Sequence, residues 1–231
     1  MGARPAVTER HFTDRVDAGE RLADALAVHA PRPEIILAIP RGGVIVGAAV
    51  ARRLGVPLDV VVPRKVGAPG NPELAVGAVA EGVEAIDHQA VRRLGLDLVA
   101  VADAARKATE EVARRTAIYR AGRPSPDLTG RTVAVVDDGV ATGWTCVAAA
   151  RWCRHAGAAR VILAVPVGPV GLERRVGGVV DEVVVLETPE PYLAVGQAYV
   201  RFPQVSDDEV LRALRALREE EERQGERQPP R

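Results

Sequence analysis

Two adjacent acids and a short glycine–threonine segment are the residues best placed to do chemistry. Asp137 and Asp138 follow four apolar residues at the end of the segment 131–136, and the segment 141–145 (Ala-Thr-Gly-Trp-Thr) follows them at the expected start of a helix. A helix N-terminus offers free N–H groups and a partial positive charge, glycine lets backbone approach an anion, and threonines add hydroxyl donors. Residues 141–145 therefore predict a phosphate-binding loop with two carboxylates beside it.

The two carboxylates restrict what the ligand can be. They would repel a bound phosphate unless they face something else, such as sugar hydroxyls or the hydration shell of Mg²⁺. A phosphorylated pentose satisfies both demands. The alternative is that Asp137 and Asp138 only cap the following helix, for which one residue would suffice.

The acids and the loop after them need the edge of a sheet to position them. The alternation of strand-like and helix-like patterns along the chain predicts such a sheet. Short apolar runs predict buried strands, and a 3.6-residue period predicts helices. The expected strands are 34–40, 58–62, 131–136, 160–165 and 181–186, and the expected helices are 14–29, 44–55, 98–121, 146–157 and about 206–222, the last opened by a Ser206–Glu209 capping box. Ligands of open α/β sheets bind beyond the carboxyl ends of strands, which is where Asp137 and Asp138 fall.

The chain between the second and third expected strands is dense in glycine and proline. Residues 64–73 predict a long exposed loop, and residues 74–86 predict a β-hairpin that turns near Glu81-Gly82. Lys65 in this loop and Lys107 are the only lysines among 31 basic residues. In a chain that otherwise uses arginine, a lysine in this loop suggests a point-charge contact with phosphate. The alternative is that Lys65 is a solvent-exposed loop residue without a specific role.

Composition narrows the class of protein. The 231 residues carry 31 basic and 31 acidic side chains, and this balance disfavours a broad nucleic-acid or membrane surface. No apolar run approaches the roughly 20 residues of a membrane span, and the first residues lack a signal-peptide core, so we expect a cytoplasmic protein. Because 47% of residues are hydrophobic but only 3% aromatic, we expect aliphatic strands covered by helices in an α/β fold.

The sequence lacks the residue patterns of several other kinds of active site. The sequence has no G-x-S-x-G for a serine nucleophile, no dinucleotide or Walker-type glycine motif, and no metal-ligand spacing among its four histidines. Cys146 and Cys153 are seven residues apart on one expected helix, a spacing that suits two buried apolar side chains better than a disulfide. We therefore expect no metal site built from protein ligands alone.

Three strings resemble type I phosphoribosyltransferases. VAVVDDGVATGWT resembles the family's signature for phosphoribosyl diphosphate (PRPP), ILAIPRGG its pyrophosphate loop, and RKVGAPGNPELAVGAVAEG its flexible loop and antiparallel arm. The resemblance covers roughly residues 35–200 and is closest to a bacterial subgroup with P-R-G-G, R-K-x-G-x-P-x-N-P-E and V-D-D-G-x-A-T-G. It implies one α/β domain over 1–223, with a parallel sheet flanked by helices, an antiparallel arm, a small hood over about 186–205, and a disordered tail over 224–231.

The resemblance also implies roles for individual residues. Asp137 and Asp138 would bind the ribose 2′- and 3′-hydroxyls, and the 5′-phosphate would meet Ala141, Thr142, Gly143, Trp144 and Thr145. Pyrophosphate would meet Arg64, Lys65 and the main chain of Arg41 and Gly42, the last two over a strained peptide bond. Glu81 on the arm is a candidate general acid or base, so the expected catalytic set is Asp137, Asp138, Lys65 and Glu81.

The acceptor side departs from the family pattern. Ala141 stands where hypoxanthine and guanine enzymes carry a carboxylate, and the A-T-G string is similar to the adenine-type loop, although bulky Trp144 replaces a small residue. Residues 188–202 resemble the hood of purine enzymes, with Tyr192 or Tyr199 as residues that stack on a base. Packing in the core is the alternative for both tyrosines.

The reaction implied is transfer of the 5-phosphoribosyl group from Mg²⁺-PRPP to a nitrogen nucleophile, a base or an amine, with release of pyrophosphate. Mg²⁺ would be held mainly by PRPP itself. The expected partners are PRPP and a small nitrogen acceptor, with no nucleic acid and no membrane, and a homodimer is compatible with this function. The alternative is a regulator or sensor that binds PRPP or a nucleotide without turnover.

Overall fold

A five-stranded parallel sheet forms the centre of the molecule. The computed structural model describes residues 11–225. The strands are β1 (Ile35–Ala38), β2 (Leu58–Val60), β6 (Thr132–Val136), β7 (Arg160–Val167) and β8 (Glu182–Glu187), in the order β2-β1-β6-β7-β8. Val136 pairs with Ala38 on one side and with Ala164 on the other, so the central strands end side by side. The expected α/β class is confirmed.

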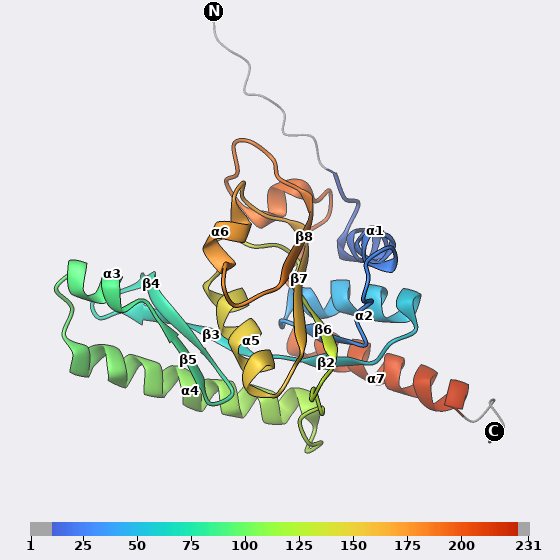
Figure 1. Cartoon of the computed structure of the whole chain (residues 1–231), viewed down its shortest axis with the longest axis horizontal. Coiled ribbons are helices and arrows are strands. Elements are labelled where there is room, and N and C mark those ends of the chain that lie inside the picture. Colours follow the sequence, from blue (N-terminus) through green and yellow to red (C-terminus); the bar gives the residue numbers. More distant parts are fainter. Residues whose placement is uncertain (1–10, 226–231) are drawn as a thin grey trace, which may run out of the picture.

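Helices cover both faces of this sheet, as Figure 1 shows. Successive side chains of a strand point to opposite faces, and the buried residues accordingly fall into two clusters. Ile36 and Val136 pack with α1 (Arg15–Ala27), α2 (Gly42–Leu54) and α7 (Asp207–Gly225). Leu37 and Val135 pack with α5 (Trp144–His155) and α6 (Leu172–Val176). The strands are thus buried on both sides by aliphatic residues, as the composition predicts.

An arm extends from one side of the sheet (Figure 1). It contains the antiparallel strands β3 (Pro63–Ala68), β4 (Asn71–Ala80) and β5 (Val83–Ile86), then α3 (His88–Arg93) and the long α4 (Leu98–Arg120). Ala78, Ala80 and Ala85 pack in the cluster that includes α5, whereas Val66 and Val76 pack in the cluster that includes α4. The arm is therefore clamped between two helices, and its turn at Glu81-Gly82 lies where the sequence predicts it.

Residues 64–73 do not form the expected long exposed loop. They form most of β3 and the start of β4, with the connection at Pro69-Gly70, where Gly70 has a φ of +80°. A Cβ at Gly67 would lie 2.6 Å from the Pro72 carbonyl oxygen, so this glycine permits close approach of two strands. Glycine and proline here mark a strand irregularity and a tight turn, which the sequence alone does not distinguish from a loop.

Two helices begin earlier than their patterns predict. Helix α2 begins at Gly42 and α5 at Trp144, rather than at residues 44 and 146. The short helices α3 and α6 were not expected, because segments of this length carry too little periodicity. The Ser206–Glu209 capping box is present, since the two residues exchange backbone-to-side-chain hydrogen bonds of 2.8 and 3.2 Å.

The hood is built jointly by residues near both ends of the described chain. It contains the 3-10 helix η1 (Val195–Ala198), and Phe12 forms an isolated bridge with Tyr199. The Tyr199 and Phe202 rings stack with centroids 4.8 Å apart. The N-terminal segment is thus part of the hood, which the sequence analysis confined to about 186–205.

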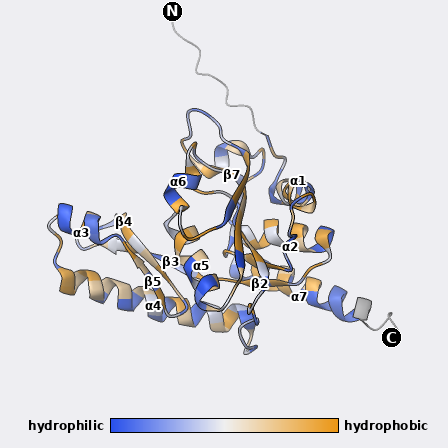
Figure 2. Ribbon diagram, viewed as in Figure 1, coloured by the Kyte–Doolittle hydropathy of each residue, from blue (hydrophilic) through white to orange (hydrophobic). Residues whose placement is uncertain are grey.

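The surface of the described chain is polar at its extremities. Figure 2 shows hydrophilic residues on α3 and on the outer end of α7, and hydrophobic residues along the central elements. Helix α7 continues to Gly225, beyond the expected end, and the rest of the expected tail lies outside the described residues. Within residues 11–225, no helix is both long and apolar enough to cross a membrane.

Candidate functional site

The acidic pair lies at the carboxyl end of β6, in the middle of the sheet. The backbone N–H of Asp138 donates to Asp137 Oδ1 at 2.8 Å, which fixes the first carboxylate against the chain. Both residues are only partly exposed. Burial, followed by the negative charge of Asp138, raises the pKa of the Asp137 carboxyl well above its ordinary value. One acid of the pair therefore resists ionisation, a property common at functional sites.

The start of α2 packs directly on this pair. The peptide between Pro40 and Arg41 is cis, and the chain enters α2 at Gly42. A Cβ at Gly42 would clash with Asp138 Oδ2, and a Cβ at Gly43 would lie 2.9 Å from the Asp137 Cα. Both glycines are thus required for the close approach of two loops. The turn that resembles a pyrophosphate loop and the acidic pair form one surface.

The predicted phosphate loop leads from the acids into α5. Gly143 is the residue before the helix and has a φ of +87°. A Cβ there would face Val176 and Leu172 of α6 at 3.5 and 3.8 Å, so glycine is needed for its backbone conformation rather than to make room for an anion. The backbone N–H groups of residues 142–145 donate to no other residue within the described chain. They remain available to a ligand.

Arg175 of α6 lies beside this loop. It donates from Nη1 to the Ala141 carbonyl oxygen at 3.2 Å. A guanidinium next to the open end of a helix adds positive charge where a phosphate would bind. Sequence reasoning missed Arg175, because α6 is short and lies 34 residues further along the chain.

Arg64 and Lys65 lie on β3, which begins close to the same edge of the sheet. Arg64 and Pro40 line a common recess, and Arg64 Nη1 is 3.6 Å from Glu111 Oε1 of α4. Lys65 and Lys107 both line an open hollow of about 430 Å³ between β3 and α4, together with Arg64. The two lysines of the chain therefore line the same hollow, although one comes from the arm strand and the other from a helix.

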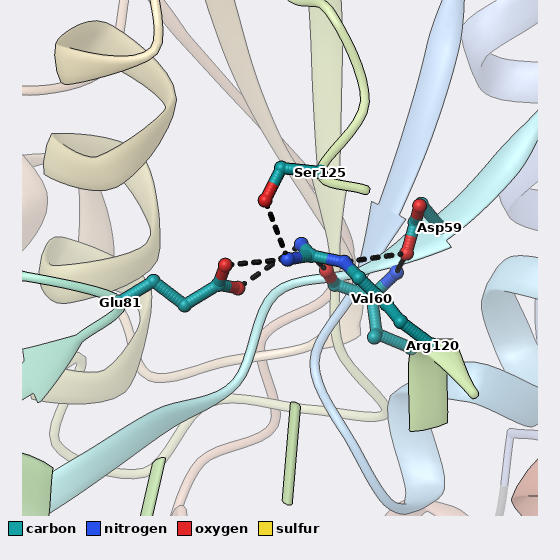
Figure 3. A network of polar contacts seen from close by, with 5 residues as sticks. All are labelled: Asp59, Val60, Glu81, Arg120 and Ser125. Atoms are coloured by element: carbon teal, nitrogen blue, oxygen red, sulfur yellow. Dashed lines mark hydrogen bonds and ion pairs between the residues drawn. The ribbon is translucent and has the colours of Figure 1, made fainter. Parts of the chain in front are cut away.

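Glu81 is not free to act on a substrate in this arrangement. Figure 3 shows its carboxylate facing Arg120, whose Nη1 and Nη2 donate to Glu81 at 2.5 and 3.0 Å. Arg120 also donates to Ser125 Oγ at 2.8 Å and to Asp59 Oδ1 at 3.3 Å. Burial raises the pKa of Glu81 despite the ion pair with Arg120. These contacts favour a structural role, in which Glu81 ties the arm to α4 and β2.

The hood tyrosines contact the loop that follows β6. The Tyr192 hydroxyl donates to the Val140 carbonyl at 2.7 Å, and the Tyr199 hydroxyl donates to the Asp138 carbonyl at 2.6 Å. Tyr199 is 1% exposed, and its ring packs in the hood core, so the core alternative fits Tyr199 better than stacking on a base. Tyr192 is partly exposed and keeps both possibilities.

The site includes one buried cation that the sequence analysis did not select. Arg15 of α1 donates from Nε to Asp138 Oδ2 at 2.8 Å. The described residues contain no cluster of three or more His, Cys, Asp or Glu that could hold a metal.

These features define an α/β protein whose sheet edge joins an acidic pair, a glycine turn and an open helix N-terminus. The family described as "Phosphoribosyl transferase domain" matches residues 15–191. The chain belongs to this family.

Several relatives agree with that placement. A Mycobacterium tuberculosis protein provisionally named a phosphoribosyl transferase is 48% identical over 88% of this chain and 46% of its own length. The chain thus spans about half the length of this curated relative. An adenine phosphoribosyltransferase of Rhodococcus opacus is 32% identical over 76% of this chain and 81% of its own. The crystal structure of TT1426 from Thermus thermophilus is 42% identical, with a TM-score of 0.76 over 88% of this chain and 97% of that one.

Proposed function

We propose that this protein transfers the 5-phosphoribosyl group from Mg²⁺-PRPP to a nitrogen nucleophile and releases pyrophosphate. The observation that carries the proposal is the contact of Asp138 with Gly42, which brings the acids that would bind the sugar next to the turn that would bind pyrophosphate. A ligand with a sugar between a phosphate and a pyrophosphate matches the order of loop, acids and turn along this edge. Family membership supports the same reaction class.

The residues would act by positioning and by charge. Asp137 and Asp138 would accept hydrogen bonds from the ribose hydroxyls, and the N–H groups of residues 142–145 would hold the 5′-phosphate. The main chain of Arg41 and Gly42, with Lys65, would hold pyrophosphate as it leaves. Fixing the sugar at both ends favours an oxocarbenium-like transition state at C1′. Mg²⁺ held by PRPP oxygens would neutralise part of the charge on the leaving group.

The second substrate of the proposed reaction is the nitrogen acceptor. The named activity of the Rhodococcus opacus relative makes adenine the first base to test. Ala141 offers no side chain that could exchange a proton with a base. Tyr192 is partly exposed and is held beside the loop by its hydrogen bond to the Val140 carbonyl, so it is the aromatic residue proposed to stack on the acceptor. An acceptor that carries its own basic nitrogen needs least help from the protein.

The test is pyrophosphate release. The protein is incubated with Mg²⁺-PRPP and a panel of adenine, other bases, simple amines and nucleoside monophosphates. Release with one acceptor, lost in the Asp137→Asn, Asp138→Asn double variant, is the expected result. Tight binding of Mg²⁺-PRPP without release for any acceptor would instead support the regulator or sensor, and absence of binding would reject both.

A second variant checks the phosphate loop. Thr145→Val removes one hydroxyl donor and should weaken ribose 5-phosphate binding by about 0.5–1.5 kcal/mol. Thr109→Val, whose hydroxyl donates to the Ala105 carbonyl at 3.0 Å on α4, is the matched control and should leave binding unchanged. If Thr145→Val and the parent bind ribose 5-phosphate equally, the Thr145 hydroxyl makes no contribution to the proposed phosphate loop.

A further inference from the structure

Arg15 is a buried arginine that contacts two distant segments. Its side chain is 9% exposed, its Nε donates to Asp138 Oδ2 at 2.8 Å, and its Nη1 donates to the Pro203 carbonyl at 2.8 Å. The guanidinium carbon also lies 3.8 Å from the centre of the Phe202 ring. Arginine is rarely buried unless paired, and its planar fork suits one fixed geometry. Arg15 thus joins α1, the end of β6 and the hood at a single point.

The Arg15–Asp138 ion pair lies on the proposed pyrophosphate turn. A Cβ at Gly42 would clash with Asp138 Oδ2 and would lie 2.8 Å from Arg15 Nε. Arg15 donates to Oδ2 of Asp138 and makes no hydrogen bond to Oδ1 of this carboxylate. Arg15 therefore fixes the carboxylate without occupying the oxygen that a ligand hydroxyl would need.

Arg15 also offsets the charge of the acidic pair. A guanidinium in contact with the pair favours its ionised state, in which the carboxylates accept hydrogen bonds best. When both acids are ionised, it also reduces the net charge of the group from −2 to −1, which limits repulsion of a phosphorylated ligand. The other titratable groups that face the pair are Cys146, Tyr192 and Tyr199. Burial raises the pKa of each of them, to about 12 for Tyr192, so all three are neutral at physiological pH.

We propose that Arg15 is a positioning residue of this site, which holds the Asp138 carboxylate on the Arg41–Gly42 turn and sets the charge of the acidic pair. The inference rests on the proposed function for its consequence in ligand binding. It extends the site to α1 and the hood, outside the motifs that carry the family resemblance. Because Arg15 reaches the sugar through Asp138, it is not assigned a contact with substrate.

A merely structural role makes a different prediction. If Arg15 only ties α1 to the hood, its loss lowers stability and leaves titration of the acidic pair unchanged. Arg201 provides the matched control, because it donates to Asp14 Oδ2 at 2.6 Å across the same seam but has a side chain that is 67% exposed. Arg201 makes no ion pair with Asp137 or Asp138.

The experiment is a titration of the ligand-free protein by NMR, with the aspartate carboxyl carbons labelled and assigned from the Asp137→Asn and Asp138→Asn variants. Arg15→Met should raise the titration midpoint of the acidic pair by about 1–3 pH units, the usual effect of an opposite charge within about 4–6 Å. Arg15→Lys should retain most of the parent midpoint, and Arg201→Met all of it. An unchanged midpoint in folded Arg15→Met would overturn the inference.

Two further measurements address a variant that fails to fold and a parent protein that fails to bind the ligand. If Arg15→Met does not fold, Arg15→Gln is titrated instead, because it can still donate to Asp138 but carries no charge, and the same upward shift is expected. Calorimetry with Mg²⁺-PRPP follows. If the parent does not bind, the proposed function fails while the titration still decides the effect of Arg15. If the parent binds, Arg15→Met should bind at least about tenfold more weakly at pH 7, and equal affinity would overturn the inference.

Discussion

Asp137 and Asp138 are neighbours in sequence but differ in their electrostatic surroundings. Asp138 is paired with Arg15 at 2.8 Å, whereas the hydrogen bond that Asp137 accepts comes from the neutral Asp138 N–H. Burial and the charge of Asp138 raise the pKa of Asp137. Ionisation of Asp137 therefore lowers the stability of the fold, whereas ionised Asp138 balances the charge of the buried Arg15 guanidinium.

We expect the two acids to respond differently to amidation. Asp138→Asn should lower the free energy of unfolding by about 1–3 kcal/mol, because Arg15 then stays buried opposite a neutral amide. Asp137→Asn should leave that free energy unchanged or raise it near pH 7, because it removes an unfavourably buried charge. Urea unfolding measures both, and greater destabilisation by Asp137→Asn would contradict this expectation.

The two lysines allow a matched comparison at the arm. Lys107 Nζ is paired with Asp103 at 2.8 Å, whereas Lys65 has no ion pair among the described residues. Lys65→Met should weaken pyrophosphate binding about tenfold, as expected for one charge-assisted hydrogen bond, and Lys107→Met should change it little. Calorimetry with Mg²⁺-pyrophosphate measures both, and equal losses would show that the hollow acts only through its summed charge.

At the scale of elements, the arm is joined to the sheet by a buried ionic network. Arg120 is 3% exposed and contacts Glu81 of the β4–β5 turn, Asp59 of β2 and Ser125 after α4 (Figure 3). These partners come from three segments, so their positions depend on one guanidinium. The network ties the β4–β5 turn to β2 and to the end of α4, and thereby anchors the antiparallel sheet that carries Arg64 and Lys65.

Removing that guanidinium should be costly. Arg120→Met should lower the free energy of unfolding by about 3–5 kcal/mol, because two carboxylates lose their cation in a buried site. Adding Glu81→Gln should recover part of the loss, since one uncompensated charge disappears. Arg106→Met, on the exposed face of α4, is the control. Chemical unfolding of the parent, the two single variants Arg120→Met and Glu81→Gln, and their double variant measures the coupling, with Arg106→Met unfolded alongside. Strict additivity of Arg120→Met and Glu81→Gln would argue against the network.

At the scale of the whole molecule, stability and ligand binding should depend on pH in opposite directions. A carboxyl whose pKa is raised by folding contributes stability that is present below its unfolded value, here 3.8, and is lost as pH rises through the folded value. Ionised Asp137 is also the better acceptor for sugar hydroxyls. The site therefore gains binding capacity over the same range in which the fold loses stability.

Stability and ligand affinity, each plotted against pH, should therefore change in opposite directions as Asp137 titrates. The contribution of Asp137 to the free energy of unfolding, measured as the difference between the parent and Asp137→Asn, should fall as pH increases from about 4 through the titration of Asp137, and affinity for Mg²⁺-PRPP should rise over the same range. Asp137→Asn should flatten the stability profile in this range. Urea unfolding and calorimetry at matched pH values measure the two curves, and a stability profile equally steep in Asp137→Asn would assign the slope to another group.

The sequence determined much of the architecture and the location of the acids. The runs 34–40 and 131–136 predicted buried parallel strands, and the residues after them fall at one edge because parallel strands end together. The prediction of a loop over 64–73 was wrong, because glycine and proline mark a bulge, a tight turn or a loop by the same residue types. Periodicity also placed the starts of α2 and α5 two residues late, since glycines carry no hydrophobic signal.

Only the tertiary structure decided which charges meet. The contacts of Arg15 with Asp138 and of Arg120 with Glu81 span 123 and 39 residues, and no local pattern encodes such pairs. Periodicity and motif spacing report on a few consecutive turns of chain, whereas ion pairs depend on how whole helices pack on the sheet. The sequence by itself therefore determined where the acids and the predicted phosphate loop lie, and packing decided that Asp138 is neutralised by α1 and that Glu81 is held by α4.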